Sequence, residues 1–322
     1  METATLRSIL EYAVRAPSTH NTQPWLFKIS EGKELEIFYD PQYVLKQADK
    51  ELRDLHISIG CMLENLRLAS MHFGYNAEIS FGPFSENFKK AHVVFVQKSL
   101  LSDLDKRLFE TINKRVNARG VFSPIAIPDI VKKQIIEMSS GSKIKLTLIE
   151  SKEDIKKIGM LTEQSMHMAY ENKSFRKEMS GWMNSNISSK KEGIPGFALK
   201  MPFFLSFFIP FFVRFFNMGN ILGRKNYESI SSAPLLVMFS GEDIELSWIE
   251  TGILAEKVML FLQSLNFQTS IFVGAIEMGD FYKEIMSITK NTTRPQFLFG
   301  AGKILGMHKI TPRHDIDRKI IF

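Results

Sequence analysis

Hydrophobic residues repeat at helical spacing in several stretches of the chain and alternate with polar residues in others. Two long buried helices are predicted, over 51–73 and 249–265. Further helices are predicted over 6–14, 102–115, 127–138, 152–171, 174–186 and 279–287. Strands are predicted over 25–29, 35–39, 91–97, 143–150, 233–239, 270–273 and 296–299, with a turn at 31–33 joining the first two. Because both element types occur throughout, the pattern predicts an α+β fold.

The two long helices resemble each other in sequence. When Ile57 is aligned with Ile249, Gly60 falls on Gly252 and Glu64 falls on Glu256. One interpretation is that any two core helices share an apolar stripe, and the other is that the chain contains two related halves. Both interpretations remain open at this point.

Composition narrows the class of protein. A chain of 322 residues that is 44% hydrophobic and 24% charged is typical of a globular protein with a sizeable core. The net charge of +6 suits an anionic ligand, and without long basic runs it does not indicate nucleic acid. The single Cys61 excludes an internal disulfide and is expected to be a buried hydrophobe. No signal peptide is recognisable at the N-terminus, so a cytoplasmic location is expected.

Common catalytic motifs do not match this sequence. It contains no HExxH zinc motif, EF-hand loop, Walker loop or GxSxG elbow, and no metal site is expected. The glycines of 300–306 are interpreted as a strand end and a turn, because Thr311-Pro312 follows too soon for a dinucleotide-binding helix.

The most informative segment is the polar loop between Ala16 and Trp25, which reads APSTHNTQPW. Prolines on both sides restrict it, and its hydroxyl, imidazole and amide groups could contact a planar heterocycle. From composition alone, a solvated turn after a helix is the favoured interpretation of this segment.

This loop resembles the signature loop of the FMN-dependent nitroreductase family, because Pro17, Ser18, Asn21, Gln23 and Pro24 all stand in place before Trp25. The resemblance implies that loop residues contact the flavin. His20 lies within the loop and either meets the ring or faces solvent. No side chain is assigned as a catalytic acid or base, because hydride transfer belongs to the flavin.

The second part of the chain is similar to other segments of the same family. Residues 114–122 resemble its basic phosphate-binding segment, which makes Arg115, Asn117 and Arg119 candidates, although either arginine could instead be structural. Residues 231–237 and 248–252 resemble its central strand and helix. The resemblance also implies a backbone amide near the flavin at Gly274 or Ala275, and a closing phosphate ligand at Arg313.

The distribution of these segments implies a nitroreductase-like fold built from two unequal halves that form a pseudo-dimer. Half A, 1–105, carries the polar loop, and half B, 106–322, carries the basic segment together with an insert at about 187–225. This arrangement resembles the tandem, lid-bearing Acg-like branch of the family. The strand and helix of the two halves are expected to follow in opposite chain order, which would make the symmetry imperfect.

The resemblance implies an NAD(P)H-dependent oxidoreductase that uses FMN to reduce nitroaromatics, quinones or similar planar acceptors. The alternative is a flavin storage protein that buries FMN under a lid. Whether the protein also forms a homodimer is left open by the sequence.

Phenylalanines crowd the insert between residues 201 and 216. They form two neighbouring rows at i+4 spacing, which are Phe203, Phe207, Phe211 and Phe215, and Phe204, Phe208, Phe212 and Phe216. A face this apolar is expected to be covered by the body of the protein, by a partner or by lipid. The favoured hypothesis is a lid over the flavin, and the second is docking of 201–216 on a membrane surface.

Overall fold

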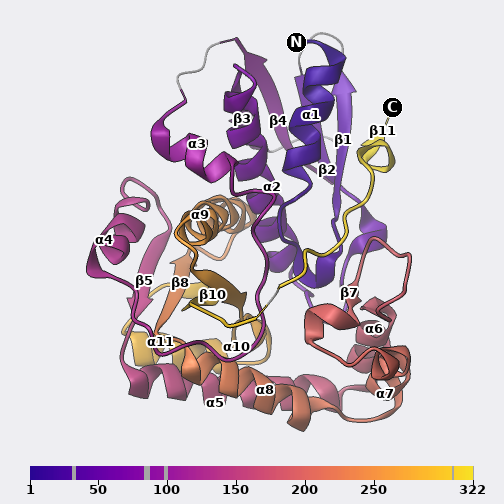
Figure 1. The fold of residues 1–322 in the computed structure, drawn as a ribbon, viewed down its shortest axis with the longest axis vertical. Helices are drawn as coiled ribbons and strands as arrows, with labels where there is room; N and C mark the ends of the chain where they lie inside the picture. The colour runs from indigo at the N-terminus through magenta and orange to yellow at the C-terminus, as the bar shows by residue number, and fades with distance from the viewer. Residues whose placement is uncertain (31–33, 83–87, 98–100, 307, 322) are drawn as a thin grey trace.

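A five-stranded sheet lies at one end of the molecule, beside both chain termini (Figure 1). Its strand order is β11-β1-β2-β4-β3. The computed structural model describes residues 1–30, 34–82, 88–97, 101–306 and 308–321, so the turn expected at 31–33 lies outside the described residues. The strands are β1 (Trp25–Ser30), β2 (Glu34–Tyr39), β3 (Asn76–Ser80), β4 (Lys89–Val96) and β11 (Ile320–Ile321).

A second, four-stranded sheet lies at the other end of the core and is antiparallel throughout, in the order β5-β8-β10-β9. Its central strand β8 is buried along its whole length, as its continuous apolar sequence predicts. A bulge between Pro295 and Phe297 interrupts the β10–β8 pairing. The strands are β5 (Lys145–Ile149), β8 (Leu235–Gly241), β9 (Gln268–Ile271) and β10 (Arg294–Gly302).

The two sheets are built in the same chain order. Near the N-terminus the order is α1 (Thr3–Ala13), β1, β2, α2 (Arg53–His72), β3 and β4. It recurs as α4 (Asp129–Glu137), β5, β8, α9 (Glu245–Ser264), β9 and β10. The opposite order expected from the sequence is therefore wrong. The insertions separating β5 from β8 and β9 from β10 hid the repeat, because they displace equivalent elements along the chain.

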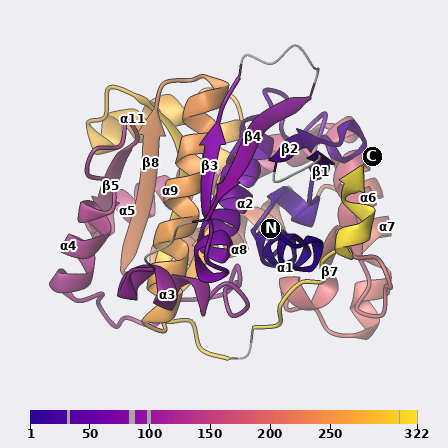
Figure 2. The ribbon, with the colours of Figure 1, turned by 90° about the horizontal axis from the view of Figure 1, so that it is seen from above.

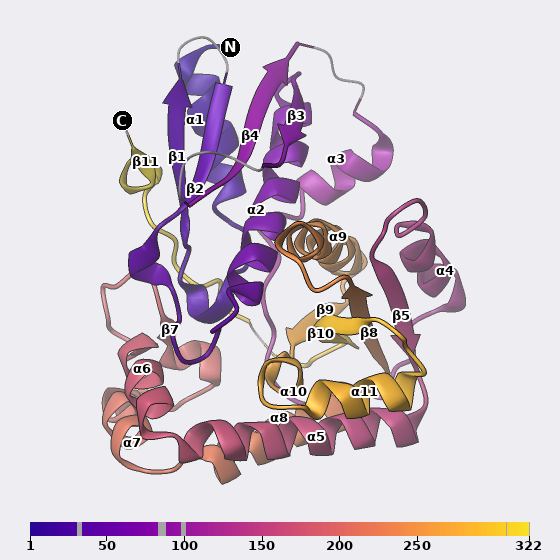
Figure 3. The same cartoon turned by 180° about the vertical axis from the view of Figure 1, so that it is seen from behind.

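Helices α2 and α9 cross at the centre of the molecule. Figures 1 and 3 both show α9 nearly end-on beside α2, and in Figure 2 both lie near the middle of the core. A Cβ built on Gly60 would lie 2.0 Å from the Ile249 carbonyl oxygen, and one on Gly252 would lie 2.0 Å from the Ile57 carbonyl oxygen. The backbones approach this closely because neither glycine has a side chain. The contact is reciprocal, in the register that the sequence alignment of the two helices gave.

Most of the remaining helices lie along the second sheet or at one corner of the molecule, whereas α3 (Asp103–Phe109) packs against α2 and α9. Helices α5 and α8 run along the edge beneath that sheet, and α6 and α7 lie at the adjoining corner (Figure 1). Short parallel strands, β6 (Met183–Asn184) and β7 (Ile194–Pro195), belong to the same corner. The helices are α3 (Asp103–Phe109), α5 (Lys152–Glu171), α6 (Lys173–Trp182), α7 (Ile209–Phe215), α8 (Gly219–Ser232), α10 (Gly274–Glu277) and α11 (Phe281–Thr289).

The C-terminal segment crosses from the second sheet back to the first. Strand β11 pairs in parallel with β1, and the Phe27 amide donates to the Lys319 carbonyl at 2.7 Å. The buried Lys319 ammonium donates to the Gln23 carbonyl at 2.6 Å. The last residues of the chain thus extend the first sheet and pass the polar loop on the way.

Candidate functional site

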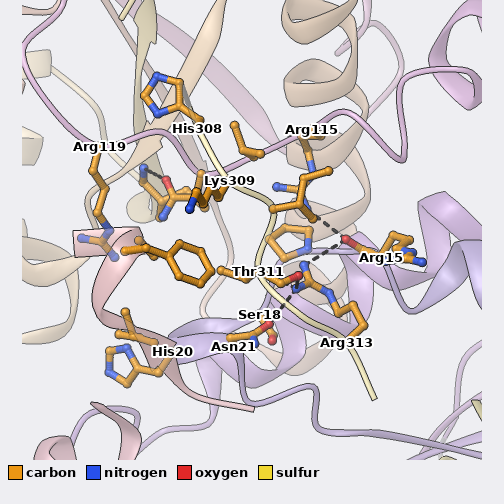
Figure 4. A pocket seen from close by; sticks show the side chains of 18 of the residues that line it. Arg15, Ser18, His20, Asn21, Arg115, Arg119, His308, Lys309, Thr311 and Arg313 are labelled. Atoms are coloured by element: carbon orange, nitrogen blue, oxygen red, sulfur yellow. Dashed lines mark hydrogen bonds between the residues drawn. The ribbon is translucent and has the colours of Figure 1, made fainter. Parts of the chain in front are cut away.

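A cavity of about 200 Å³ opens where the polar loop, the basic segment, the insert and the C-terminal segment meet (Figure 4). A second cavity of about 140 Å³ shares part of its lining. The residues common to both are Pro17, Ser18, His20, Asn117, Arg119 and Ile271. Segments that are far apart in the sequence therefore form one continuous site.

The loop backbone takes an unusual path after α1. His20, Asn21 and Gln23 all have left-handed backbone angles, with φ of 52°, 57° and 53°. Such angles are uncommon outside glycine and indicate a conformation held by its surroundings. The Ser18 hydroxyl contributes by accepting a hydrogen bond from the Gln23 amide at 2.9 Å.

The amide side chains of the loop bind protein groups. Asn21 Nδ2 donates to the carbonyls of Lys191 at 3.0 Å and Pro312 at 3.2 Å. Gln23 is fully buried, and its Nε2 donates to the same Lys191 carbonyl at 2.8 Å, while its Oε1 accepts from the His314 amide at 2.8 Å. Asn21 and Gln23 thus fasten the insert and the C-terminal segment to the loop, and Gln23 does not line the cavity.

Arg313 lines the cavity, but its guanidinium is engaged by the loop. Its Nε donates to the Val14 carbonyl at 3.0 Å, and its Nη2 donates to those of Arg15 and Ala16 at 3.1 and 3.0 Å. Its Nη1 donates to Asn21 Oδ1 at 2.8 Å. Burial, with Arg115 and Arg15 nearby, lowers the pKa of Arg313 to about 9. The Arg313 side chain binds the backbone carbonyls at and just after the end of α1. Most of its N–H donors therefore already have acceptors within the protein.

The two arginines of the basic segment have different surroundings. Arg115 is buried, and its Nε donates to Glu256 on α9 at 3.0 Å. Burial raises the pKa of Glu256 to about 7, against the lowering effect of Arg115. Arg119 lines both cavities and forms no hydrogen bond or ion pair with the described part of the chain. Of the two candidates, Arg115 is structural in this arrangement and Arg119 is free to meet an anion.

Asn117 and His20 present further polar groups. Asn117 Oδ1 accepts from the Ile271 amide at 3.0 Å and joins the basic segment to the end of β9. The Nε2 atom of His20 is buried without a hydrogen-bond partner among the described residues. Burial, with the charge of Arg119 nearby, lowers the pKa of His20 to about 4, so its ring is neutral near pH 7. His20 is therefore a half-buried residue that lines the site, with its Nε2 atom on the buried side.

Gly274 and Ala275 do not reach either cavity. A Cβ on Gly274 would meet the Ser165 hydroxyl at 3.1 Å on α5, and Ala275 is buried in the core beside that helix. Their near neighbours Ile271 and Val273 line the second cavity instead. The turn after β9 does reach the site, but with residues earlier in the sequence than expected.

Several lining residues were not expected from the sequence. They are Arg15, Phe197, Lys200, His308 and Lys309 in the first cavity, with Asp54 and Ser58 in the second. Arg15 stands directly before the loop, which was a usable signal, whereas Lys200 and Lys309 reach the site only through folding. Figure 4 shows Lys309 lying between Arg119 and the group formed by Arg115, Arg15 and Arg313.

Charge is distributed very unevenly around the first cavity. Its lining carries six cationic side chains and, among the described residues, no Asp or Glu. The cations are Arg15, Arg115, Arg119, Lys200, Lys309 and Arg313. Such a lining attracts an anion, and guanidinium groups bind phosphate oxygens through charge-assisted hydrogen bonds.

Relatives found by sequence agree with the resemblance of the loop. A Mycobacterium tuberculosis protein that carries the provisional name NAD(P)H nitroreductase is 32% identical over 124 residues, which are 38% of this chain and 36% of that protein. Another from the same organism, the provisional NAD(P)H nitroreductase Acg, is 24% identical over 61% of this chain and 59% of its own length. The chain is related to the Acg-like nitroreductases.

The similarity is partial in extent. The chain spans about a third of the length of the first of these relatives. An uncharacterized M. tuberculosis protein is 20% identical over 97% of this chain and 91% of its own length. No protein-family model matches the chain.

Solved structures give a weaker likeness. The FMN-dependent nitroreductase NfnB of Mycobacterium smegmatis has a TM-score of 0.42 at 12% identity, over 68% of this chain and 99% of that one. A nitroreductase from Bacteroides fragilis has a TM-score of 0.39 at 13% identity, over 63% of this chain and 92% of that one. At these TM-scores the likeness indicates no function for this chain.

Proposed function

We propose that this chain is an FMN-binding, NAD(P)H-dependent oxidoreductase of nitroreductase type that reduces nitroaromatics, quinones or similar planar acceptors. The single observation that carries the proposal is the cavity where the nitroreductase-like loop meets six cations without an acidic neighbour in the described lining. The names of the sequence relatives support the same class of reaction.

The residues of the site fit the parts of FMN. The flavin phosphate is a dianion, and Arg119, Lys200 and Lys309 line the cavity without an ion pair to a described residue. The ring edge needs hydrogen-bond donors and acceptors, and the unpartnered His20 Nε2 can supply one of them. Pro17 and Ile271 provide apolar walls in both cavities. Phosphate binding falls mainly to the free cations, because Arg313 and Arg115 are engaged by protein groups.

Bound FMN would accept a hydride from NAD(P)H and pass electrons to the acceptor. The chain's own residues hold and orient the reactants. Asn21, Gln23 and Arg313 fix the loop, and Glu256 fixes Arg115 at the wall of the site. The neutral His20 adds no positive charge near the ring at pH 7.

We also propose that the chain is a pseudo-dimer of half A, 1–105, and half B, 106–322. Of the two flavin sites that such a dimer would have, the chain keeps one. The repeated chain order and the reciprocal contact of Gly60 and Gly252 support this interpretation. The connection from α1 to β1 carries the polar loop, whereas the equivalent connection from α4 to β5 reads Met138-Ser139-Ser140-Gly141 and lacks it. Only one of two equivalent positions therefore has the residues expected to meet FMN.

The decisive experiment is a visible absorption spectrum of the purified protein after addition of FMN, followed by anaerobic addition of NADPH or NADH. We expect a bound-flavin spectrum that bleaches within seconds and recovers when a nitroaromatic or a quinone is added. A protein that binds no FMN contradicts the proposed cofactor. A protein that binds FMN but is not reduced contradicts the enzyme and favours storage.

Flavin storage is a second candidate because the insert is fastened over the loop. The side-chain amides of Asn21 and Gln23 both donate to the Lys191 backbone carbonyl. The Gly193 backbone N–H donates to the Asn21 backbone carbonyl at 3.3 Å. Gly193, Ile194, Phe197 and Ala198 then line the cavity. If these contacts restrict access, Phe197→Ala should speed both FMN release and reduction by NADPH. If the protein is instead an enzyme with an open site, the unaltered protein should already release FMN slowly and be reduced quickly by NADPH.

A further inference from the structure

The eight phenylalanines of residues 203–216 do not cover the cavity. None of the eight in 203–216 is among its described lining residues, and Phe197 is the phenylalanine that lines it. All eight are exposed, with exposed fractions between 42% and 77%. The expectation that the phenylalanine rows form a lid over the site is therefore not met, and another function must be sought for this surface.

The phenylalanine face is held rigidly from its inner side. Ile209 and Val213 on α7 are buried in a core cluster with Tyr170 and Met179. The buried Ser206 hydroxyl accepts from the Asn186 amide at 3.0 Å and donates to the Phe203 carbonyl at 2.7 Å. The segment breaks into a short 3₁₀ turn (Phe204–Phe207) and α7, with Pro210 in the first turn of the helix. The inner face is already packed, so it fixes the aromatic face toward the outside.

The charge of this region is positive. No Asp or Glu occurs between Gly193 and Tyr227, whereas Lys200, Arg214, Arg224 and Lys225 are all exposed. The Arg214 guanidinium lies over the Phe215 ring, 5.6 Å from its centroid, and Arg224 pairs with Glu228 at 3.2 Å. Exposed aromatic side chains in a segment that carries cations and no acidic residue suit the boundary between lipid headgroups and acyl chains, where the rings enter and the cations meet anionic headgroups.

We propose that the surface formed by residues 203–216, which include Arg214, and by the nearby Lys225 docks the protein peripherally on a membrane rich in anionic phospholipid. No helix in the described part of the chain is long and apolar enough to cross a bilayer, so the contact is interfacial. A second copy is a poorer occupant, because face-to-face packing would bring the same cations of both copies together without an acidic residue of the segment to neutralise them. The corner position of α7 leaves this surface accessible (Figure 1).

Co-sedimentation of the full chain with vesicles tests the proposal. We expect the protein to sediment with phosphatidylcholine vesicles that contain phosphatidylserine, and to bind much less to pure phosphatidylcholine. Replacing four outer phenylalanines together, Phe204→Ser, Phe208→Ser, Phe211→Ser and Phe215→Ser, should lower the partition coefficient by about tenfold or more. The pair Arg214→Gln and Lys225→Gln should reduce the preference for anionic vesicles and its sensitivity to salt.

A matched control removes apolar surface elsewhere. Ile130 and Ile136 on α4 are 63% and 43% exposed, so Ile130→Ser with Ile136→Ser should leave vesicle binding unchanged. Circular dichroism and the melting temperature establish that each variant is folded. The proposal is overturned if the unaltered protein stays in solution with both vesicle types, or if the phenylalanine variant sediments like the unaltered protein. A dimer in sedimentation velocity without lipid that the same four substitutions abolish would assign the surface to a second copy and overturn it as well.

Discussion

The two sides of the cavity use their polar residues differently. On the side of the loop, Asn21, Gln23 and Arg313 have most of their hydrogen-bonding groups on protein partners. On the other side, Arg119 and Lys200 have no ion pair among the described residues. A conspicuously polar loop can thus be the scaffold of a site, while cations from other segments are the ones that stay free of protein partners.

The largest effect is expected from Arg313→Ala. The substitution leaves the carbonyls of Val14 and Ala16 without their side-chain donor, whereas the Arg15 carbonyl keeps Arg115 Nη2, and it should lower the free energy of unfolding by roughly 2 to 4 kcal/mol. Urea denaturation measures this change. Arg318→Ala is the control, because Arg318 is exposed in the same segment and its side chain forms no hydrogen bond with a described residue.

If Arg313→Ala lowers FMN affinity while stability stays as in the control, the guanidinium serves the ligand and not the loop. Arg313 would then bind the ligand, which contradicts the assignment of the loop side of the cavity to a purely structural role.

Arg119→Gln should give the converse result. We expect stability to stay nearly unchanged, because Arg119 has no partner to lose in the described chain, while FMN binding weakens by about 10- to 100-fold through loss of a charged hydrogen bond. Fluorescence titration with FMN gives the affinity. Lys133→Gln, an exposed site outside the cavity, controls for the change in net charge. Equal affinity for Arg119→Gln and the control would remove Arg119 from the phosphate site.

The smallest effect concerns the pH dependence of stability at His20. Unfolded His20 takes up a proton near pH 6.5, but the folded residue does so only near pH 4, so the unfolded state binds more protons between these values. Lowering the pH through this window should therefore cost stability. Carboxyl groups with raised pKa values, such as Glu256 and Glu277, act in the opposite direction.

The difference between the unaltered protein and His20→Gln isolates the contribution of this histidine. Urea midpoints measured between about pH 7 and pH 4 should fall more for the unaltered protein than for the variant. Parallel curves would place His20 in a solvated position, against its buried and unpartnered Nε2.

Most of the regular elements could be predicted from the sequence, because their apolar periodicity follows from local geometry. Helices α2 and α9 and strand β8 fall close to their predicted ranges. The helix predicted over 102–115 ends at Phe109, and the next residues turn so that Arg115 meets Glu256 on α9. Strands β3, β6, β7 and β11 were missed. The two residues of β11 form a strand only because β1 lies beside them.

The candidate site was only partly predictable. The sequence located the loop and the basic segment, and the structure brings Pro17, Ser18, His20, Asn21, Arg115, Asn117, Arg119 and Arg313 to one cavity. It leaves out Gln23, Gly274 and Ala275. Lys200 and Lys309 could not be found, because nothing near them in the sequence shows that they face the loop.

The sequence by itself determined the mixed α+β architecture, the kinship of the two long helices and the loop that indicates the nitroreductase family. These properties depend on local periodicity and on short motifs. Only the tertiary structure decided which polar groups are already bound and which phenylalanines remain outside. A side chain's partners are set by contacts between distant segments, as Asn21 shows by bonding Lys191, Pro312 and Arg313 at once.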